Sequence, residues 1–209
     1  RSKKIDLKEG KSYINPKWDN NDKLSVFLNK LNNIDIHNNN QCTILHNQRN
    51  VLYKYDFADK NLAVKKFKLH RTYDKLRFRF LHSKAVRSFK MAMYLKKLNI
   101  LTPNPVAVVE KRDSFRKILF SYYITEYIDY DYNLLDIVSN TDHELREKVI
   151  DFMPYLGKTI KKMHDNGFIH NDLHVGNILL KDIDNPSFYY IDLNRARIKK
   201  TLNPKMRMK

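Results

Sequence analysis

One polar segment in the last quarter of this 209-residue chain constrains its fold more than any other feature. The segment reads His-Asn-Asp-Leu-His-Val-Gly-Asn over residues 170–177 and runs directly into a short apolar strand. Asp172 precedes Asn177 by five residues, and a second apolar run, at 188–191, ends on Asp192. Two short apolar runs joined by a polar turn predict a β-hairpin. Asn177 would then lie just before the hairpin, and Asp192 just after it.

The chemistry of these three side chains is that of phosphoryl transfer. One carboxylate must accept or orient the proton of the attacking hydroxyl, and an amide oxygen and a second carboxylate must hold Mg²⁺ against the phosphates. The kinase catalytic loop H-x-D-x-x-x-x-N, followed by a metal-binding Asp, has the same spacing. The pattern therefore predicts a Mg²⁺-dependent phosphotransferase. Asp172 would be its base or hydroxyl-orienting carboxylate, and Asn177 and Asp192 its metal ligands.

The charge of the chain is strongly basic and unevenly placed. The formal net charge is +17, and the segment from Lys65 to Lys97 holds twelve Lys or Arg residues against one acid, Asp74. Seven more basic residues and no acid lie between Leu193 and the end. Such a field predicts an anionic partner: phospholipid head groups, a phosphorylated glycolipid, a nucleotide or nucleic acid. Charge alone does not choose among these partners, and a merely solvated basic face is the simpler alternative.

Bulk features narrow the class of protein further. No stretch approaches the roughly 18 consecutive apolar residues of a membrane span, and the start of the chain holds no signal-like segment. The first residue is Arg rather than Met, which indicates a fragment. Cys42 is the single cysteine, so an internal disulfide is excluded and a reducing, cytoplasmic compartment fits best.

The apolar periodicity predicts strands followed by helices. Residues 1–21 look irregular, with Trp18 as their anchor, and the Asn-rich residues 32–41 look like a loop. Five strands are expected in a small antiparallel sheet, at 42–45, 50–55, 62–67, 106–109 and 118–124. Helices are expected at 22–31, 83–98 and 144–164. Pro154 should kink or divide the last helix, and Gly167 should end it. This element order is typical of a bilobal protein kinase.

Residues 42–197 resemble the protein-kinase-like superfamily and, within it, the Kdo/WaaP lipopolysaccharide kinase family. The resemblance rests on Leu62-Ala63-Val64-Lys65, on Thr102-Pro103-Asn104-Pro105, and on Ile191-Asp192-Leu193-Asn194-Arg195, which stands where most kinases have Asp-Phe-Gly. It implies an α+β fold in three parts. An N-terminal extension at 1–41 would precede an N-lobe at 42–125, an antiparallel sheet with one helix. The C-lobe at 126–209 would be mostly helical and truncated, because only 12 residues follow Arg197.

The resemblance also implies an activity and its residues. Members of the family use ATP and Mg²⁺ to phosphorylate a Kdo or heptose sugar of the lipopolysaccharide inner core, at the cytoplasmic face of the bacterial inner membrane. By this analogy Lys65 contacts the ATP phosphates, although Lys66 or Lys68 could take that place. Glu126 and Ile128 match the hinge whose backbone pairs with adenine. Substrate contacts are expected from Arg195, Arg197 and His174. For Arg195 the alternative is an ordinary ion pair with a carboxylate of the C-lobe, and His170 is expected to brace the loop.

The expected partners are therefore the core glycolipid and the anionic surface of the inner membrane, and no nucleic acid is expected. Besides its short C-terminal end, the chain departs from the kinase pattern at two places. The first hairpin turn, at 46–50, contains no glycine, and the helix at 83–98 contains no acid to pair with Lys65. Asp74 or an acid of the C-lobe could substitute. Two alternatives stay open: a small-molecule kinase of the choline or aminoglycoside type, and a pseudokinase that binds an anionic partner through its basic face.

Overall fold

The computed structural model describes residues 2–7, 10–58, 60–68 and 78–202 and divides the chain into two compact units. The first unit contains Arg1–Phe89 and Asn104–Tyr127, and the second contains Lys90–Pro103 and Ile128–Lys209. The first unit therefore includes the predicted extension at 1–41. The segment Lys90–Pro103, which the sequence assigns to the N-lobe, falls in the second unit.

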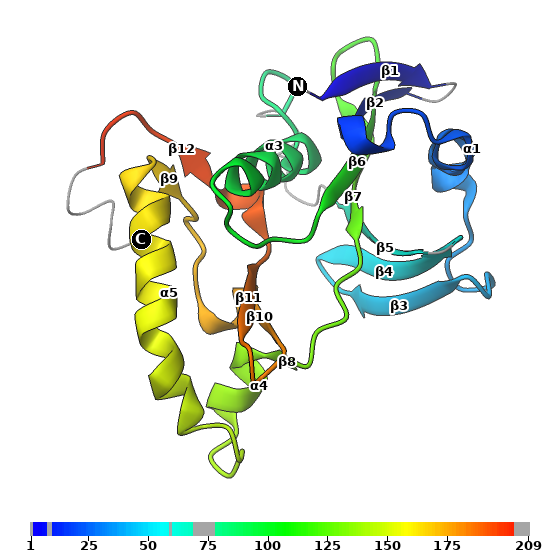
Figure 1. The fold of residues 1–209 in the computed structure, drawn as a ribbon. Helices are drawn as coiled ribbons and strands as arrows, with labels where there is room; N and C mark the ends of the chain where they lie inside the picture. The colour runs from blue at the N-terminus through cyan, green and yellow to red at the C-terminus, as the bar shows by residue number, and fades with distance from the viewer. Residues whose placement is uncertain (1, 8–9, 59, 69–77, 203–209) are drawn as a thin grey trace. The chain divides into compact units, whose positions relative to one another are not determined.

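The first unit is built on a seven-stranded antiparallel sheet with the strand order β1-β2-β6-β7-β5-β4-β3 (Figure 1). Its strands are β1 Lys3–Leu7, β2 Gly10–Ile14, β3 Cys42–Asn47, β4 Asn50–Phe57, β5 Lys60–Phe67, β6 Pro105–Arg112 and β7 Ile118–Glu126. All five predicted strands are confirmed, each somewhat longer than its apolar run. Strand ends extend beyond the apolar residues because the backbone ladder continues where side chains are polar.

The prediction of irregular structure at 1–21 is wrong. β1 and β2 form a hairpin there, and β2 pairs with β6 from Lys11↔Glu110 to Ile14↔Ala107. Ser12 and Ile14 are buried, whereas most of β1 is exposed or half-buried. An edge hairpin of this kind carries little alternating apolar pattern. Pairing with a neighbouring strand, which the local sequence does not reveal, holds it in the sheet.

Helix α1, Asp22–Lys30, covers one face of the sheet. The Asn21 side chain caps it by accepting from the Leu24 N–H at 2.9 Å. Phe27 is buried on α1, and the helix packs against residues of β4, β5 and β7 in one cluster that includes Tyr53, Val64 and Ile124. Because successive strand residues point to opposite faces, the sheet has a core face under α1 and a second face on its other side.

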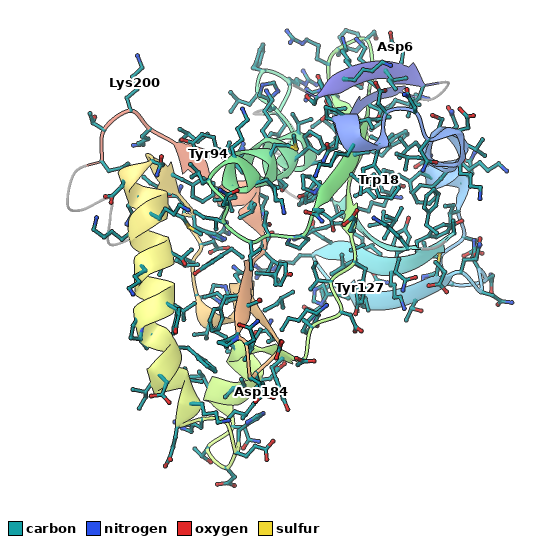
Figure 2. All side chains as sticks on the ribbon, in the orientation of Figure 1. Asp6, Trp18, Tyr94, Tyr127, Asp184 and Lys200 are labelled. Carbon is teal, nitrogen blue, oxygen red and sulfur yellow. The ribbon has the colours of Figure 1, made fainter. Side chains whose placement is uncertain are left out.

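Helix α3, Lys84–Lys97, begins as predicted at Ser83, whose hydroxyl accepts from the Val86 N–H at 3.2 Å. Its first residues belong to the first unit, and the residues from Lys90 onward belong to the second. In the second unit Tyr94 projects from α3 (Figure 2) and donates its hydroxyl to the Asn166 carbonyl at 2.8 Å. Its ring stacks on Phe168, with ring centroids 6.3 Å apart. Tyr94 thus packs against the start of the segment that leads into residues 170–177, which we call the polar loop.

The second unit combines helices with short strands. Its elements are β8 Tyr132–Asn133, α4 Leu134–Ser139, α5 Lys148–Asp165, β9 Phe168–Ile169, β10 Ile178–Lys181, β11 Ser187–Tyr190 and β12 Arg197–Ile198. The strands form two small sheets, β11-β10-β8 and β12-β9 (Figure 1). The sequence pattern missed β8, β9, β12 and α4, because elements of two to six residues are too short to show a period.

Helix α5 corrects one prediction and confirms another. Pro154 lies inside it without dividing it, and the helix begins at Lys148 rather than at residue 144. The side of α5 that carries Val149, Phe152 and Leu156 is buried, and this packing compensates for the hydrogen bond that proline cannot make. The helix ends as predicted: Gly167 follows it with φ +73° and donates its N–H to the His164 carbonyl at 2.9 Å. Within the described residues no helix is long and apolar enough to cross a membrane.

Candidate active site

The β10–β11 hairpin brings the two predicted metal ligands to one end of a strand pair. Its register pairs Ile178 with Tyr190, and the Ile191 N–H donates to the Asn177 carbonyl at 3.0 Å. Asn177 therefore enters the hairpin where the returning strand leaves it, and Asp192 is the next residue but one after that strand. The hairpin expected from the sequence is confirmed.

Asn177 is also joined to the backbone of Asp172. Its side-chain Nδ2 donates to the Asp172 carbonyl at 2.8 Å, and its own N–H donates to the His174 carbonyl at 2.8 Å. The Asn177 side chain is buried. Because its amide nitrogen is used within the loop, its amide oxygen is the group left to meet a cation. The loop thus holds Asp172 and Asn177 at a set separation.

His174 contributes to the rigidity of this loop. Its Nδ1 accepts from the Gly176 N–H at 3.1 Å, and its Nε2 lies 3.1 Å from the Asn177 amide nitrogen. Only a ring nitrogen that carries no proton accepts a hydrogen bond, so the tautomer of His174 decides which of these two contacts is a hydrogen bond to the ring. A side chain at Gly176 would be crowded, since a Cβ there would lie 3.0 Å from His174 Cε1. The substrate contact expected of His174 stays a prediction.

Arg195 forms an ion pair with Asp172. Its Nη1 lies 3.0 Å from Asp172 Oδ1, and the Asn171 side chain donates to the Arg195 carbonyl at 3.2 Å. The side chain of Asp172 is 28% exposed and that of Arg195 is 61% exposed, so solvent reaches the pair. The structure contains the ion pair that the sequence left open as one role for Arg195, and the substrate contact stays a prediction. The carboxylate involved is that of Asp172 itself, which sequence reasoning did not anticipate.

His170 braces the polar loop through a hydrogen bond to the residue before Asp192, as expected. It is buried, and its Nε2–H donates to the Ile191 carbonyl at 2.9 Å. Burial lowers the pKa of His170, because a charged imidazolium would lose its hydration there; the bond to Ile191 and the charges of Asp192 and Asp172 act in the opposite direction. His170 is therefore a neutral group that joins the polar loop to the strand before Asp192.

Asp192 has a left-handed backbone, with φ 58° and ψ 48°. This conformation costs a non-glycine residue roughly 1–2 kcal/mol. Such strain is found at functional sites, where the surrounding structure holds it. The Asn194 side-chain amide donates to Asp192 Oδ1, which gives the carboxylate a defined orientation. The turn that follows, Leu193–Arg195, brings Arg195 back toward Asp172.

The available oxygen donors fit a Mg²⁺ site in which phosphate oxygens of the substrate supply the remaining ligands. No group of three or more His, Cys, Asp or Glu side chains suited to a metal lies within the described residues. Mg²⁺ in kinases is usually held by one or two carboxylates together with phosphate oxygens and water. The Asn177 amide oxygen and the Asp192 carboxylate are hard oxygen donors of the right type. As ligands of Mg²⁺ they stay a prediction.

The residues expected to bind the nucleotide lie in two places. Lys65 is in β5, where its neighbours Leu62 and Val64 point into the core under α1. Ala63 and Lys65 therefore lie on the opposite face of the sheet, and Lys65 Nζ is 5.4 Å from the centre of the Phe67 ring. Asp74, a suggested partner for Lys65, lies outside the described residues.

Glu126 ends β7 in the first unit, and Ile128 begins the longer of the two segments of the second unit. The Glu126 carboxylate accepts from Asn104 Nδ2 at 2.6 Å and from Lys60 Nζ at 3.1 Å. Its backbone N–H donates to the Asn104 carbonyl at 2.9 Å. The side chain of Glu126 thus has a structural role at the end of the sheet. The contact between the backbone at 126–128 and adenine stays a prediction.

Comparison with known protein families decides the classification. The model of the Lipopolysaccharide kinase (Kdo/WaaP) family matches residues 39–209, which is most of the chain. The chain belongs to this family. The resemblance inferred from the motifs is thereby confirmed, and the chain is a member of a kinase family.

Solved structures show the same fold. WaaP, solved in complex with acyl carrier protein, aligns with a TM-score of 0.57 at 18% identity, over 80% of this chain and 66% of that one. A MAP kinase of Leishmania major aligns with a TM-score of 0.50 at 20% identity, over 74% of this chain and 46% of that one. At these identities the likeness establishes the α+β, protein-kinase-like fold alone.

One curated relative is similar over a short stretch. A subunit of the EKC/KEOPS complex of Schizosaccharomyces pombe (strain 972) is 33% identical over 55 residues, which is 26% of this chain and 23% of that protein. The chain thus matches about a quarter of the curated relative and about two thirds of WaaP.

Proposed function

We propose that this chain is an ATP- and Mg²⁺-dependent kinase that phosphorylates a sugar hydroxyl, of Kdo or of a heptose, in the lipopolysaccharide inner core. The observation that carries the proposal is the joining of Asp172, Asn177 and Asp192 around one end of the β10–β11 hairpin, in a chain of the Kdo/WaaP family. Phosphoryl transfer depends on positioning and charge stabilisation more than on a strong base. A loop held by many hydrogen bonds suits that requirement.

In this mechanism Asp172 accepts a hydrogen bond from the acceptor hydroxyl and orients its oxygen toward the γ-phosphorus. Arg195 holds one oxygen of Asp172, so the carboxylate keeps a single orientation. Asn177 and Asp192 would hold Mg²⁺, and the ion would offset the negative charge of the phosphates when bound. His170 keeps the loop in register with the strand before Asp192 through its bond to Ile191.

The remaining site residues follow from the family resemblance. Lys65 binds the α- and β-phosphates from the face of the sheet opposite α1, and the backbone at Glu126 and Ile128 pairs with adenine. In this proposal His174 and Arg197 contact the sugar acceptor. Arg197 is exposed in β12, opposite Ile169 of the strand that leads into the polar loop.

The proposed place of work is the cytoplasmic surface of the bacterial inner membrane, where the glycolipid acceptor is anchored. The net charge of +17 supports attraction to anionic lipids and to the acidic acceptor. The WaaP relative was solved with acyl carrier protein, and a protein of that kind is a further candidate partner.

The test is transfer of labelled γ-phosphate from Mg·ATP to Kdo-containing lipid A. Asp172→Asn should lower the rate by about a thousandfold or more, because the amide cannot accept the hydroxyl proton. Asp184→Asn, at an exposed residue of the β10–β11 turn (Figure 2), is the matched control and should retain full activity.

The other outcomes separate the alternatives. Transfer to choline or an aminoglycoside, but not to the lipid, would replace the proposed acceptor with a small molecule. Failure to bind ATP in the presence of Mg²⁺ would contradict a kinase altogether and favour a binding protein. Equal activity of the Asp172→Asn variant and the parent protein would remove Asp172 from the mechanism.

A further inference from the structure

Two loops of the first unit expose large apolar side chains. Phe80 is 75% exposed and Leu81 is 46% exposed in the loop before α3. Phe115 is 76% exposed and Leu119 is 52% exposed at the turn and in the returning strand of the β6–β7 hairpin. Single exposed apolar residues are ordinary, whereas a group of them on neighbouring loops marks a site of interaction.

One arginine joins the two loops. The Arg112 guanidinium donates to the Leu81 carbonyl at 3.2 Å and to the Arg116 carbonyl at 3.2 Å, and it also donates to the Phe78 carbonyl. Since carbonyls of both loops bond to the same planar group, the loops lie against each other. Phe78 is buried and anchors its loop. The loops that carry the four exposed side chains are therefore neighbours, and we call these side chains the loop face: Phe80, Leu81, Phe115 and Leu119.

The surroundings of the loop face are cationic. Residues 78–89 and 110–119 contain seven Lys or Arg residues and two acids. Both acids are engaged within the protein: Glu110 accepts from Arg112 Nε at 2.6 Å, and Asp113 accepts from the Lys117 N–H at 2.8 Å. The cations of these segments are Arg79, Lys84, Arg87, Lys111, Arg112, Arg116 and Lys117.

We propose that the loop face docks on an anionic phospholipid bilayer. Phe80 and Phe115 would enter the interface between head groups and acyl chains, and exposed cations beside them, such as Arg116 and Lys117, would reach lipid phosphates. Apolar anchors within a basic surround are the pattern of proteins that lie on membranes. A protein partner is less suited, because lysine is depleted where protein interfaces form. The inference deepens the membrane attachment in the proposed function by giving it a surface.

The test is co-sedimentation with vesicles of phosphatidylethanolamine and phosphatidylglycerol, with phosphatidylcholine vesicles as the neutral comparison and without ATP. The double variant Phe80→Ser/Phe115→Ser should bind anionic vesicles at least about tenfold more weakly than the parent protein. Ile150→Ser on α5 is the matched control, because Ile150 is 72% exposed and lies in the other unit. It should bind as the parent does.

Charge is tested separately. Arg116→Glu/Lys117→Glu should weaken vesicle binding at least about fivefold more than Lys158→Glu/Lys162→Glu, which reverses two exposed charges on α5. Equal losses in the two variants would reduce the attraction to net charge alone and overturn the assignment of this surface. Circular dichroism of each variant establishes that it is folded.

The depth to which position 115 enters the bilayer can be measured in protein that still binds vesicles. Phe115→Trp should be quenched by brominated lipids, whereas Ile150→Trp should not, with Trp18 as a background common to both. Absence of quenching at position 115 in vesicle-bound protein would overturn the proposal. Unchanged vesicle binding by Phe80→Ser/Phe115→Ser would also overturn it. If that variant bound vesicles as the parent does but no longer bound an acidic protein, the loop face would be a protein-binding surface instead. The vesicle experiments contain no nucleotide. A negative result in them would therefore contradict membrane docking but not the proposed phosphoryl transfer.

Discussion

At the scale of single residues, the ion pair between Arg195 and Asp172 decides how the polar loop presents its carboxylate. A guanidinium 3.0 Å from one oxygen leaves the other oxygen for a substrate hydroxyl. The pair is partly exposed, so its value lies in orientation more than in stability. In the proposed mechanism Arg195 is a positioning residue for Asp172.

Arg195→Ala should therefore lower kcat about 10- to 100-fold with a smaller effect on KM, and Arg195→Lys should restore part of the loss. Steady-state kinetics with the lipid acceptor measure both constants. Arg197→Ala, in the adjacent strand, serves for comparison and should affect KM more than kcat. If Arg195→Ala raised KM alone, the residue would contact the substrate rather than orient Asp172.

His170 gives the fold a defined response to pH. Its pKa is lowered in the folded state by burial, so the unfolded chain binds a proton that the folded chain refuses. The stabilisation is fully present above the ordinary histidine pKa and is lost as pH falls through the lowered one. Acid should therefore weaken the fold below about pH 6.5.

His170→Gln keeps a donor for the Ile191 carbonyl but cannot titrate. Urea unfolding between about pH 7.5 and pH 5.5 should show a shallower loss of stability in this variant, by at most about 1.4 kcal/mol per pH unit. His143→Gln, on a half-buried residue near α5, is the control and should keep the parent slope. An identical slope in all three proteins would contradict a neutral His170.

At the scale of elements, the glycine inside α5 and the glycine that follows α5 have opposite roles. Gly167 ends α5 with φ +73°, and a Cβ there would lie 2.1 Å from the Lys199 carbonyl oxygen. Gly157 lies inside α5, and a Cβ there would meet nothing within 4 Å. The two positions form a matched pair in which one substitution tests the turn and the other tests the helix.

Gly167→Ala should lower the free energy of unfolding by about 2 kcal/mol or more, because the left-handed backbone is strained and β9 would be pushed from β12. Gly157→Ala should raise it by about 0.5–1 kcal/mol, because alanine favours the helix. Chemical denaturation measures both. Equal effects in the two variants would show that the close approach at Gly167 does not constrain the fold.

At the scale of the whole molecule, the first 41 residues matter for stability. Helix α1 supplies three members of the main cluster under the sheet, Leu24, Phe27 and Leu28, and the turn that follows it supplies Leu31. Phe27 also lies 4.5 Å from the Tyr55 ring and 5.6 Å from the Phe57 ring, measured between centroids. Residues with this share of the core are part of the folded unit rather than an appendage.

Phe27→Ala should consequently destabilise the first unit by about 3–5 kcal/mol, the usual cost of removing a buried aromatic side chain. Val26→Ala, on the exposed side of the same helix, should change stability by no more than about 0.5 kcal/mol. Thermal unfolding of both variants distinguishes them. A small effect of Phe27→Ala would mean that the sheet folds without α1.

The sequence by itself determined the elements with strong local signals. The strands at 42–67 and 105–126 carry apolar runs, α3 begins at a serine cap, and the hairpin after Asn177 is bounded by a turn of Asp, Asn and Pro. These features arise from backbone conformation and burial within a few residues of one another, so a pattern can reveal them. The same local motifs identified the kinase family.

Tertiary structure alone decided the contacts between distant segments. Arg195 is 23 residues from Asp172, and Arg112 is 31 residues from Leu81, so neither pairing leaves a local pattern. The β1–β2 hairpin was missed because its place in the sheet depends on pairing with β6, and Pro154 is tolerated because the opposite side of α5 is buried. The residues of the polar loop could be read from spacing. Their arrangement could not, because packing between elements sets which side chain meets which.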